Sequence, residues 1–475
     1  MKNQQSFLKK KNAFIIHHSS FKILLIFIIM FSFIFPFCKS KKQKEETVKK
    51  EYQIVKHPEW TKTANIYEVN IRQFSPSGDF KGFAKHLPRL KAMGVDILWL
   101  MPIHPIGEKN RKGSKGSYYS VKDYLAVNPD YGTMEDFKEL VKQVHAQGMY
   151  LILDWVANHT AWDNKLIEEH PDWFTKDSLG KIKSPVDDWS DVADLNYDNQ
   201  DLRKYMIDAL KFWIKEADID GYRCDVAGMV PTDFWNDARA ALDSVKPVFM
   251  LAEAEDTKLH EFAFDMTYAW ELHFLLNSIA KGDTNVAKLD KYCKKEFKNY
   301  KTDYYRMQFT SNHDENSWKG TEYERMGKGA ETFAVFCYTF PGMPLIYTGQ
   351  ETALNKRLKF FDVDSIKWGD YKLNNFYTTL NKLKKDNKAL WNGAFGGNFL
   401  RLKTGADKAV FAFTRTKEDN SILTILNMSP KSQKISIKDS IPGGEYTNIF
   451  TNIKSKIDRK LSLNLKPWEY IVLKK

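Results

Sequence analysis

Gly221-Tyr-Arg-Cys-Asp225 and Phe249-Met-Leu-Ala-Glu253 are two short runs that each end in a carboxylate. Their last residues are 28 positions apart, and one strand, loop and helix of an eight-fold βα barrel together take about 30 residues. The two runs therefore predict consecutive parallel strands of such a barrel. Residues at the carboxyl ends of barrel strands gather at one mouth, so the two carboxylates are expected to lie close together.

The same spacing extends along the chain in both directions. Tyr150-Leu-Ile-Leu-Asp154 lies one repeat plus an insertion before Asp225, and Phe309-Thr-Ser-Asn-His-Asp314 lies two repeats after Glu253. Helical patterns, such as 134–147 and 202–215, fall between the runs, and this alternation predicts a parallel sheet. The remaining predicted strands are 66–71, 97–101, 345–348 and a weaker run at 262–266, which follows Glu253 so closely that only a much shortened helix can separate them.

The predicted fold class is α/β, a TIM (β/α)8 barrel with two additions. The barrel is predicted over residues 59–390, with a small domain inserted after the third strand at 161–197. After Trp391 the pattern changes to short alternating runs separated by turns, which is typical of antiparallel strands. Residues 391–475 are therefore predicted to form a C-terminal antiparallel β-sandwich that covers one flank of the barrel.

Carboxylates that converge at a barrel mouth suit the hydrolysis of glycosidic bonds. One carboxylate must attack or stabilise the anomeric carbon, while a second, protonated near neutral pH, donates a proton to the leaving oxygen. Further carboxylates and histidines can hold the sugar and adjust the pKa of the acid.

Four segments, in this order, resemble the main motifs of the α-amylase family of glycoside hydrolases (glycoside hydrolase family 13). They are Asp154-Trp-Val-Ala-Asn-His159, Gly221-Tyr-Arg-Cys-Asp-Val-Ala227, Glu253 at the end of its apolar run, and Ser311-Asn-His-Asp314. Further segments that resemble the family are Val192-Ala-Asp-Leu-Asn196, Tyr119-Ser-Val-Lys-Asp-Tyr124, Asn128-Pro-Asp-Tyr-Gly-Thr133 and Gly342-Met-Pro-Leu-Ile-Tyr-Thr-Gly-Gln-Glu351. The resemblance extends from about Trp60 to the carboxyl terminus.

The resemblance implies three catalytic residues. Asp225 is expected to be the nucleophile that forms a glycosyl-enzyme intermediate, and Glu253 the general acid and later the base. Asp314 is expected to hold substrate hydroxyls and to help keep Glu253 protonated. A nucleophile paired with an acid implies that the anomeric configuration is retained.

The resemblance also implies five supporting residues. His159, His313 and Tyr119 are expected to bind the sugar at the cleavage point, the histidines by hydrogen bonds and the tyrosine with its ring face. Arg223 is expected to orient the nucleophile and keep it ionised, and Asp154 to hold Arg223.

Each of these residues also has a purely structural interpretation. A single Asp at a strand end is often a helix cap or an ion-pair partner. His159 could be a hydrogen-bonded core residue beside Asn158, and Tyr119 could be a core aromatic beside Tyr118. The joint occurrence of all four motifs favours the functional interpretation.

A structural calcium ion is a further expectation from the resemblance. Asn158 and Asp194 stand at positions that could supply oxygen ligands between the barrel and the inserted domain. The chemistry itself needs no cofactor. The segment after Asp225 lacks the Lys-His pair that some calcium-dependent members carry, so calcium stays open at this stage.

The amino terminus predicts export from the cell. Several lysines precede the apolar run 23–37, which is short for a membrane span, and Cys38 follows directly. Residues 1–37 are predicted to be an export signal and 38–58 a polar tether. The pattern resembles a bacterial lipoprotein signal with Cys38 as the lipidation site, which predicts a membrane-anchored protein in the periplasm or on the cell surface. The alternatives are an uncleaved anchor and a secreted protein.

Charge and cysteine content exclude several classes of protein. The formal net charge is +12, but residues 1–50 hold 11 Lys and 2 Glu, so the rest of the chain is almost neutral and no nucleic-acid partner is expected. Three cysteines remain after Cys38, an odd number that implies no disulfide framework. The sequence does not indicate an oligomeric state.

Three functions remain open from the sequence. The first is a retaining hydrolase that cleaves α-1,4 bonds of starch, glycogen or maltodextrins. The second is an α-glucan transferase, in which a sugar replaces water as the acceptor. The third is a non-catalytic, membrane-anchored binding protein or transporter subunit, which the intact Asp225, Glu253 and Asp314 disfavour, since such a protein has no need for three mutually repelling carboxylates.

Overall fold

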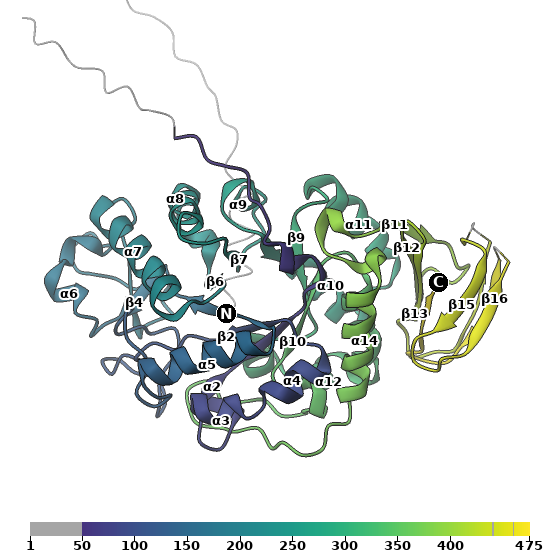
Figure 1. Ribbon diagram of the computed structural model, residues 1–475, viewed down its shortest axis with the longest axis horizontal. Coiled ribbons are helices and arrows are strands. Elements are labelled where there is room, and N and C mark those ends of the chain that lie inside the picture. The colour runs from purple at the N-terminus through teal and green to yellow at the C-terminus, as the bar shows by residue number, and fades with distance from the viewer. Residues whose placement is uncertain (1–49, 439–440, 459) are drawn as a thin grey trace, which may run out of the picture. The chain divides into compact units, whose positions relative to one another are not determined.

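The computed structural model describes residues 50–438, 441–458 and 460–475 (Figure 1). The chain divides into two compact units, Met1–Glu51 and Tyr52–Lys475, and the second contains every helix and strand of the described residues. The predicted export signal 1–37, the lipidation site Cys38 and the first part of the predicted tether lie outside the described residues.

Eight parallel strands close into a barrel, as predicted, with helices around the outside (Figure 1). Around the barrel the strands follow the order β1, β10, β9, β8, β7, β6, β3, β2. Their bounds are Ile66–Val69 (β1), Ile97–Leu100 (β2), Tyr150–Trp155 (β3), Gly221–Cys224 (β6), Phe249–Ala252 (β7), Met266–Tyr268 (β8), Tyr305–Gln308 (β9) and Met343–Tyr347 (β10).

The apolar strands are buried on both faces because side chains alternate between the barrel interior and the helix layer. On β2, Ile97 and Trp99 belong to a cluster of inward-facing residues, whereas Leu98 and Leu100 belong to the larger cluster shared with the helices. This double burial explains why the strand runs are almost continuously apolar in sequence.

Two predicted strands are displaced in the structure. The sixth barrel strand, β8, begins at Met266, whereas the prediction placed it at 262–266, and the segment Leu259–Phe262 forms α9, a helix of 4 residues. The expected shortened helix is therefore confirmed, but the strand prediction was wrong in position. The run 309–314 follows β9 rather than forming it, because polar Arg306 and Gln308 obscure that strand in the sequence.

The outer layer consists of helices whose apolar faces pack on the strands. α5 begins with a capping box in which Thr133 and Asp136 satisfy each other's backbone groups, and Asn199 caps α7. The helices are α2 (Ile71–Phe74), α3 (Phe80–Ala84), α4 (Leu87–Met93), α5 (Met134–Ala146), α7 (Gln200–Ala217), α8 (Thr232–Asp243), α9 (Leu259–Phe262), α10 (Trp270–Lys281), α11 (Ala287–Asn299), α12 (Glu322–Met326), α13 (Ala330–Thr339) and α14 (Asn374–Asp386).

The segment inserted after β3 begins with β4 (His159–Ala161), two residues before the predicted start at 161. It contains the antiparallel pair of β4 and β5 (Val192–Asp194), in which His159 lies opposite Asp194. The short helix α6 (Leu166–Glu169) and a 3-10 turn at Pro171–Trp173 lie between them.

Part of the predicted tether is packed on the barrel. The Tyr52 hydroxyl donates to Asp237 Oδ1 at 2.9 Å. The His57 ring lies 2.8 Å from Asp265 Oδ1 and stacks on Tyr305. The folded body therefore begins at Tyr52 rather than at residue 59.

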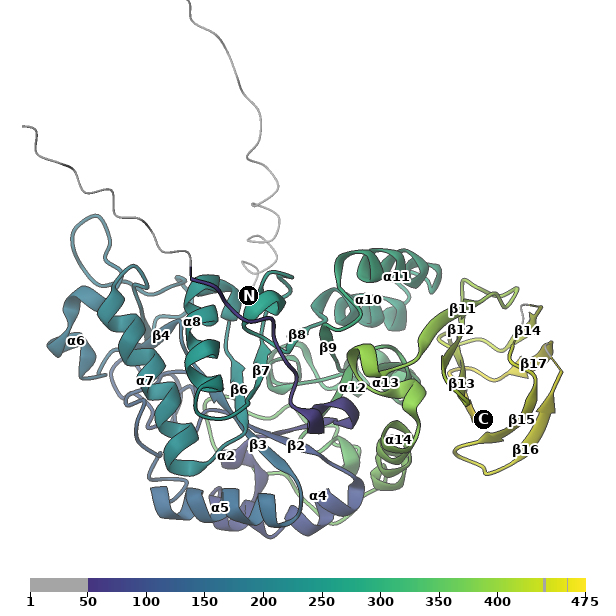
Figure 2. The ribbon, with the colours of Figure 1, turned by 45° about the horizontal axis from the view of Figure 1, so that its top comes forward.

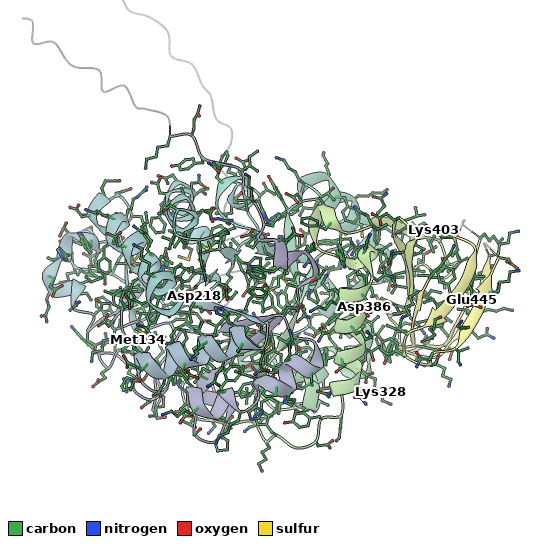
Figure 3. All side chains as sticks on the ribbon, viewed as in Figure 1. Met134, Asp218, Lys328, Asp386, Lys403 and Glu445 are labelled. Carbon is green, nitrogen blue, oxygen red and sulfur yellow. The ribbon has the colours of Figure 1, made fainter. Side chains whose placement is uncertain are left out.

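The C-terminal strands form two antiparallel sheets beside α13 and α14 (Figure 2). Phe336 of α13 packs against Phe411, and Phe340, directly after α13, packs against Phe413, so the domain covers one flank of the barrel. The side-chain view places Asp386, at the end of α14, between the barrel and the strand that carries Glu445 (Figure 3). One sheet has the order β11 (Asn398–Leu402), β12 (Val410–Lys417), β13 (Asn420–Asn427), β18 (Tyr470–Lys474), β15 (Gly444–Asn448), β16 (Lys454–Ile457), and the other pairs β14 (Gln433–Ile437) with β17 (Leu461–Leu465).

Candidate active site

The predicted carboxylates meet at the carboxyl ends of the barrel strands. Asp154 lies near the end of β3, Asp225 directly follows β6, Glu253 directly follows β7, and Asp314 lies in the segment after β9. In the register of the barrel, Asp154 is the neighbour of Arg223 on β6. Residues that are distant in sequence therefore share one mouth, as the strand spacing predicted.

Arg223 is the centre of the site. Its Nη1 donates to Asp154 Oδ1 at 2.8 Å and to Asp225 Oδ1 at 2.9 Å. Its Nη2 lies 2.9 Å from Glu253 Oε2, and this contact is an ion pair without the angle of a hydrogen bond. One fully buried guanidinium thus contacts three carboxyl groups, and only one of them can be balanced by its charge.

Aromatic residues surround this guanidinium and exclude water from it. Its carbon lies 5.0 Å from the centre of the Trp99 ring and 5.7 Å from that of Tyr268, whose hydroxyl accepts from Arg223 Nε at 3.2 Å. Low polarity strengthens the ion pairs but also penalises every uncompensated charge.

These surroundings raise the pKa values of the carboxyl groups. Burial raises the pKa of Glu253 to about 7, which Arg223 opposes and the charges of Asp225 and Asp314 reinforce. Burial also raises the pKa of Asp225, and Arg223 opposes that shift. Asp225 receives a hydrogen bond from Arg223, whereas Glu253 does not, so Glu253 is the group that keeps its proton at neutral pH and Asp225 the one that is ionised.

The backbone after Asp225 helps to hold Glu253. The Val226 N–H donates to Glu253 Oε2 at 2.9 Å. Val226 has φ 36° and ψ 43°, a left-handed conformation that is unfavourable for a β-branched residue. Such strain is concentrated at functional sites, where the surrounding structure maintains it.

His313 and Tyr119 form a hydrogen-bonded chain that ends on Asp154. Burial lowers the pKa of His313, but Asp314 and Glu68 raise it more strongly, to about 9. The charged imidazole lies 2.5 Å from Glu68 Oε1 through Nδ1 and 2.8 Å from the Tyr119 hydroxyl through Nε2. Tyr119 in turn donates to Asp154 Oδ2 at 3.0 Å. Tyr119 is thus bonded within the site and does more than fill the core.

His159 differs from His313 in charge. Burial lowers the pKa of His159 to about 3, so its ring is neutral. Asn158 Nδ2 lies 3.3 Å from His159 Nδ1, and the ring tilts against Trp189 at 5.4 Å. A neutral imidazole can donate one hydrogen bond to a sugar hydroxyl and accept another.

Asp314 is the most exposed carboxylate of the group. Its side chain is 36% exposed, compared with 11% for Asp225 and 9% for Glu253. Asp314 Oδ2 lies 3.5 Å from His313 Nε2, and Oδ1 accepts from the Trp318 indole at 3.2 Å. Solvent therefore reaches the site on the Asp314 side.

Sequence reasoning missed three residues of the site. Glu68 on β1 binds His313, Trp99 on β2 donates to Asp154 Oδ2 at 3.1 Å, and Tyr268 on β8 binds Arg223. A carboxylate inside the buried run 66–71 was the available signal for Glu68, because buried charges require partners. Nothing in the sequence distinguished Trp99 and Tyr268 from core aromatics.

The predicted calcium ligands are near each other, but the described residues contain no group of three or more His, Cys, Asp or Glu that could hold a metal ion. In the β4–β5 pair, Asp194 lies opposite His159, the residue that follows Asn158. Burial raises the pKa of Asp194, which Thr175 and Lys183 oppose. The two residues alone do not complete a calcium site, and calcium stays a prediction.

Comparison with known proteins identifies the family. The family model described as alpha amylase, catalytic domain, matches residues 33–191 and 186–393. This chain belongs to the α-amylase family. The model described as maltogenic amylase, C-terminal domain, matches residues 401–472, the region of the C-terminal sheets.

Several relatives of this α-amylase family member match over most of its length. Alpha-amylase 3 of Dictyoglomus thermophilum is 26% identical, with 87% of this chain and 94% of the relative covered. Among solved structures, the noncanonic maltogenic α-amylase AmyB from Thermotoga neapolitana has a TM-score of 0.80 at 29% identity, covering 87% of this chain and 99% of that one. An α-amylase from Lactobacillus plantarum has a TM-score of 0.78 at 31% identity, covering 88% and 99%.

The comparisons contradict the prediction that this α-amylase family member is exported from the cell. A protein named intracellular maltogenic amylase, from Bacillus subtilis, is 26% identical and matches 80% of this chain and 71% of its own length. Within residues 50–438, 441–458 and 460–475, no helix is long and apolar enough to cross a membrane. The prediction of an exported protein, which rested on the composition of the amino-terminal sequence alone, was therefore wrong.

Proposed function

We propose that this protein is a retaining α-glucan hydrolase that cleaves α-1,4-glucosidic bonds of starch, glycogen or maltodextrins. The observation that carries the proposal is the shared contact of Asp154, Asp225 and Glu253 with one buried guanidinium. The guanidinium donates a hydrogen bond to Asp225 but not to Glu253, so Asp225 is ionised and Glu253 keeps its proton. A retaining glycosidase needs such a pair of carboxyl groups. The named relatives, which are α-amylases, cyclomaltodextrinases and maltogenic amylases, support the same substrate class.

In the first step, the Asp225 carboxylate attacks the anomeric carbon of the sugar. The bond to the leaving oxygen breaks, and Glu253 transfers its proton to that oxygen. Arg223 holds Asp225 by a hydrogen bond at 2.9 Å and so fixes the direction of attack. The product is a glycosyl ester on Asp225 and a shortened glucan with a new hydroxyl group.

In the second step, water takes the place of the departed glucan. Glu253, now ionised, removes a proton from the water, which attacks the anomeric carbon and releases Asp225. Two inversions restore the original configuration. We propose that Asp314, His313 and His159 hold the hydroxyls of the sugar during both steps, with His313 Nε2 exchanging its contact with the Tyr119 hydroxyl for one with the sugar.

The test is incubation of the purified protein with maltoheptaose, with and without Asp225→Asn, and separation of products by length over time. The proposal expects shorter products only, with the α configuration in early product by NMR, and none from the variant. Longer products appearing beside the shorter ones would replace the hydrolase with a transferase. Turnover by Asp225→Asn near the rate of the unmodified protein would refute the assignment of the nucleophile.

A further inference from the structure

Trp318 is an exposed aromatic residue attached to the active site. It lies four positions after Asp314, within a π-helix at Glu315–Lys319, and is 38% exposed. Its indole Nε1 donates to Asp314 Oδ1 at 3.2 Å. The exposed ring is thereby fixed to Asp314, the most exposed carboxylate of the candidate site.

Two phenylalanines hold the Trp318 ring in place. The Phe360 ring lies 5.1 Å from it and the Phe361 ring 5.6 Å from it, both tilted. Phe360 also stacks on Tyr119, with 6.3 Å between ring centres and 16° between planes. Tyr119, Phe360 and Trp318 therefore form a continuous aromatic wall from the buried part of the site to solvent.

We infer that Trp318 is a binding platform for a glucose unit next to the one at the cleavage point, and that its indole N–H positions Asp314. This inference rests on the proposed α-glucan activity. The apolar C–H face of a glucose ring can cover an aromatic face, and covering it removes apolar area from water. Single exposed aromatics are common on protein surfaces, but the neighbours of Trp318 hold its ring beside Asp314, the most exposed carboxylate of the site.

The same contact gives Asp314 a defined orientation. One oxygen of Asp314 lies near His313 and the other is bound by Trp318. Without the indole N–H, one oxygen loses its donor and the carboxylate can rotate. Because the charge of Asp314 helps to raise the pKa of Glu253, a displaced Asp314 would lower that pKa.

Two substitutions separate the two roles. Trp318→Phe keeps an aromatic face and removes the N–H, so on maltoheptaose kcat should fall by up to about tenfold while KM stays within about twofold. Its kcat/KM should also begin to decline at a lower pH, because the pKa of Glu253 is lowered. Trp318→Ala should show the same loss in kcat together with a KM raised by about tenfold.

Phe297→Ala is the matched control. Phe297 is 47% exposed and lies against Phe399 of the C-terminal domain, so it is a similarly exposed aromatic outside the site. This control should leave kcat, KM and the pH profile unchanged. Circular dichroism of all variants checks that the fold is retained.

Calorimetric titration of maltoheptaose into Asp225→Asn, with and without Trp318→Ala, tests the platform without turnover. Weaker binding by the double variant supports the platform even if the unmodified protein proves inactive, which would refute the proposed function alone. Equal binding by the two proteins would overturn the platform. A Trp318→Phe variant with unchanged kcat and unchanged pH profile would overturn the positioning role.

Discussion

Replacing Arg223 with Met should destabilise the protein most strongly at alkaline pH. Arg223 is fully buried, and its guanidinium lies within 2.9 Å of oxygens of Asp154, Asp225 and Glu253. Met fills similar space without charge, so the variant leaves three buried carboxyl groups without a cation. Breaking a buried ion pair by removing one partner costs about 3 to 5 kcal/mol.

Protonation of the carboxyl groups limits the loss of stability in Arg223→Met. One ion pair at 4 Å contributes about 4 kcal/mol at an effective dielectric constant of 20, so three ionised carboxylates would lose far more than a single pair. Each carboxyl can instead take up a proton, at about 1.4 kcal/mol for each unit by which the pH exceeds its pKa. We expect the free energy of unfolding to fall by about 4 kcal/mol at pH 8.

The pH dependence follows from the direction of the pKa shifts. Burial raises the carboxyl pKa values in the folded state, and Arg223 opposes the increase. Without Arg223 these values rise further above the unfolded values of about 4. The folded variant then binds more protons than the unfolded chain, so its stability is greatest near pH 4 and is lost as the pH rises through the folded pKa values.

The assay is the thermal unfolding midpoint of the unmodified protein and the variant at pH 5 and pH 8. Arg223→Met should lower Tm more at pH 8 than at pH 5. Arg357→Met is the control, because Arg357 forms an exposed ion pair with Glu324, and it should leave Tm unchanged at both pH values. An equal loss of Tm at the two pH values would refute the idea that Arg223 compensates buried carboxylates.

Three further predictions test other parts of the site. Since the pKa of Glu253 is raised to about 7, kcat/KM should decline above pH 7, and Glu253→Gln should abolish this decline together with most activity; a decline that persists unchanged in the variant would assign it to another group. Glu68→Gln should lower the pKa of His313 from about 9, so the midpoint of the His313 titration in NMR should move to lower pH and the activity loss should grow with pH. An unchanged midpoint would contradict the role of Glu68. If calcium binds at Asn158 and Asp194, EDTA should lower Tm and Asp194→Asn should remove that effect, while equal Tm values in calcium and in EDTA would reject the ion.

Much of the fold was predictable because barrel strands have a local signature. The apolar runs ending at Asp154, Asp225 and Glu253 recur at the length of a βα repeat, and burial on both faces makes them stand out from the amphipathic helices between them. β9 was displaced in the prediction because one face of this strand carries the polar residues Arg306 and Gln308. Arg306 donates to the Glu296 carboxylate and Gln308 to the backbone carbonyl of Pro341.

Within the site, the sequence predicted which carboxylates share the barrel mouth but not which groups they contact. Motif resemblance made Asp225, Glu253 and Asp314 candidates, and the structure places Asp225 and Glu253 directly after β6 and β7 and Asp314 in the segment after β9. The role of Glu68 depends on β1 closing the barrel beside β10, which brings Glu68 to His313. No local pattern contains that contact.

The sequence by itself determined the repeat of strands and helices and which carboxylates stand at strand ends, because both depend on spacing along the chain. Only the tertiary structure decided how charge is distributed among them. A single arginine contacts three carboxyl groups from β3, β6 and β7, and the balance between their burial and its charge sets which one keeps a proton. That balance depends on distances of a few ångströms between strands that are far apart in sequence, and so does the contact between Trp318 and the aromatic wall.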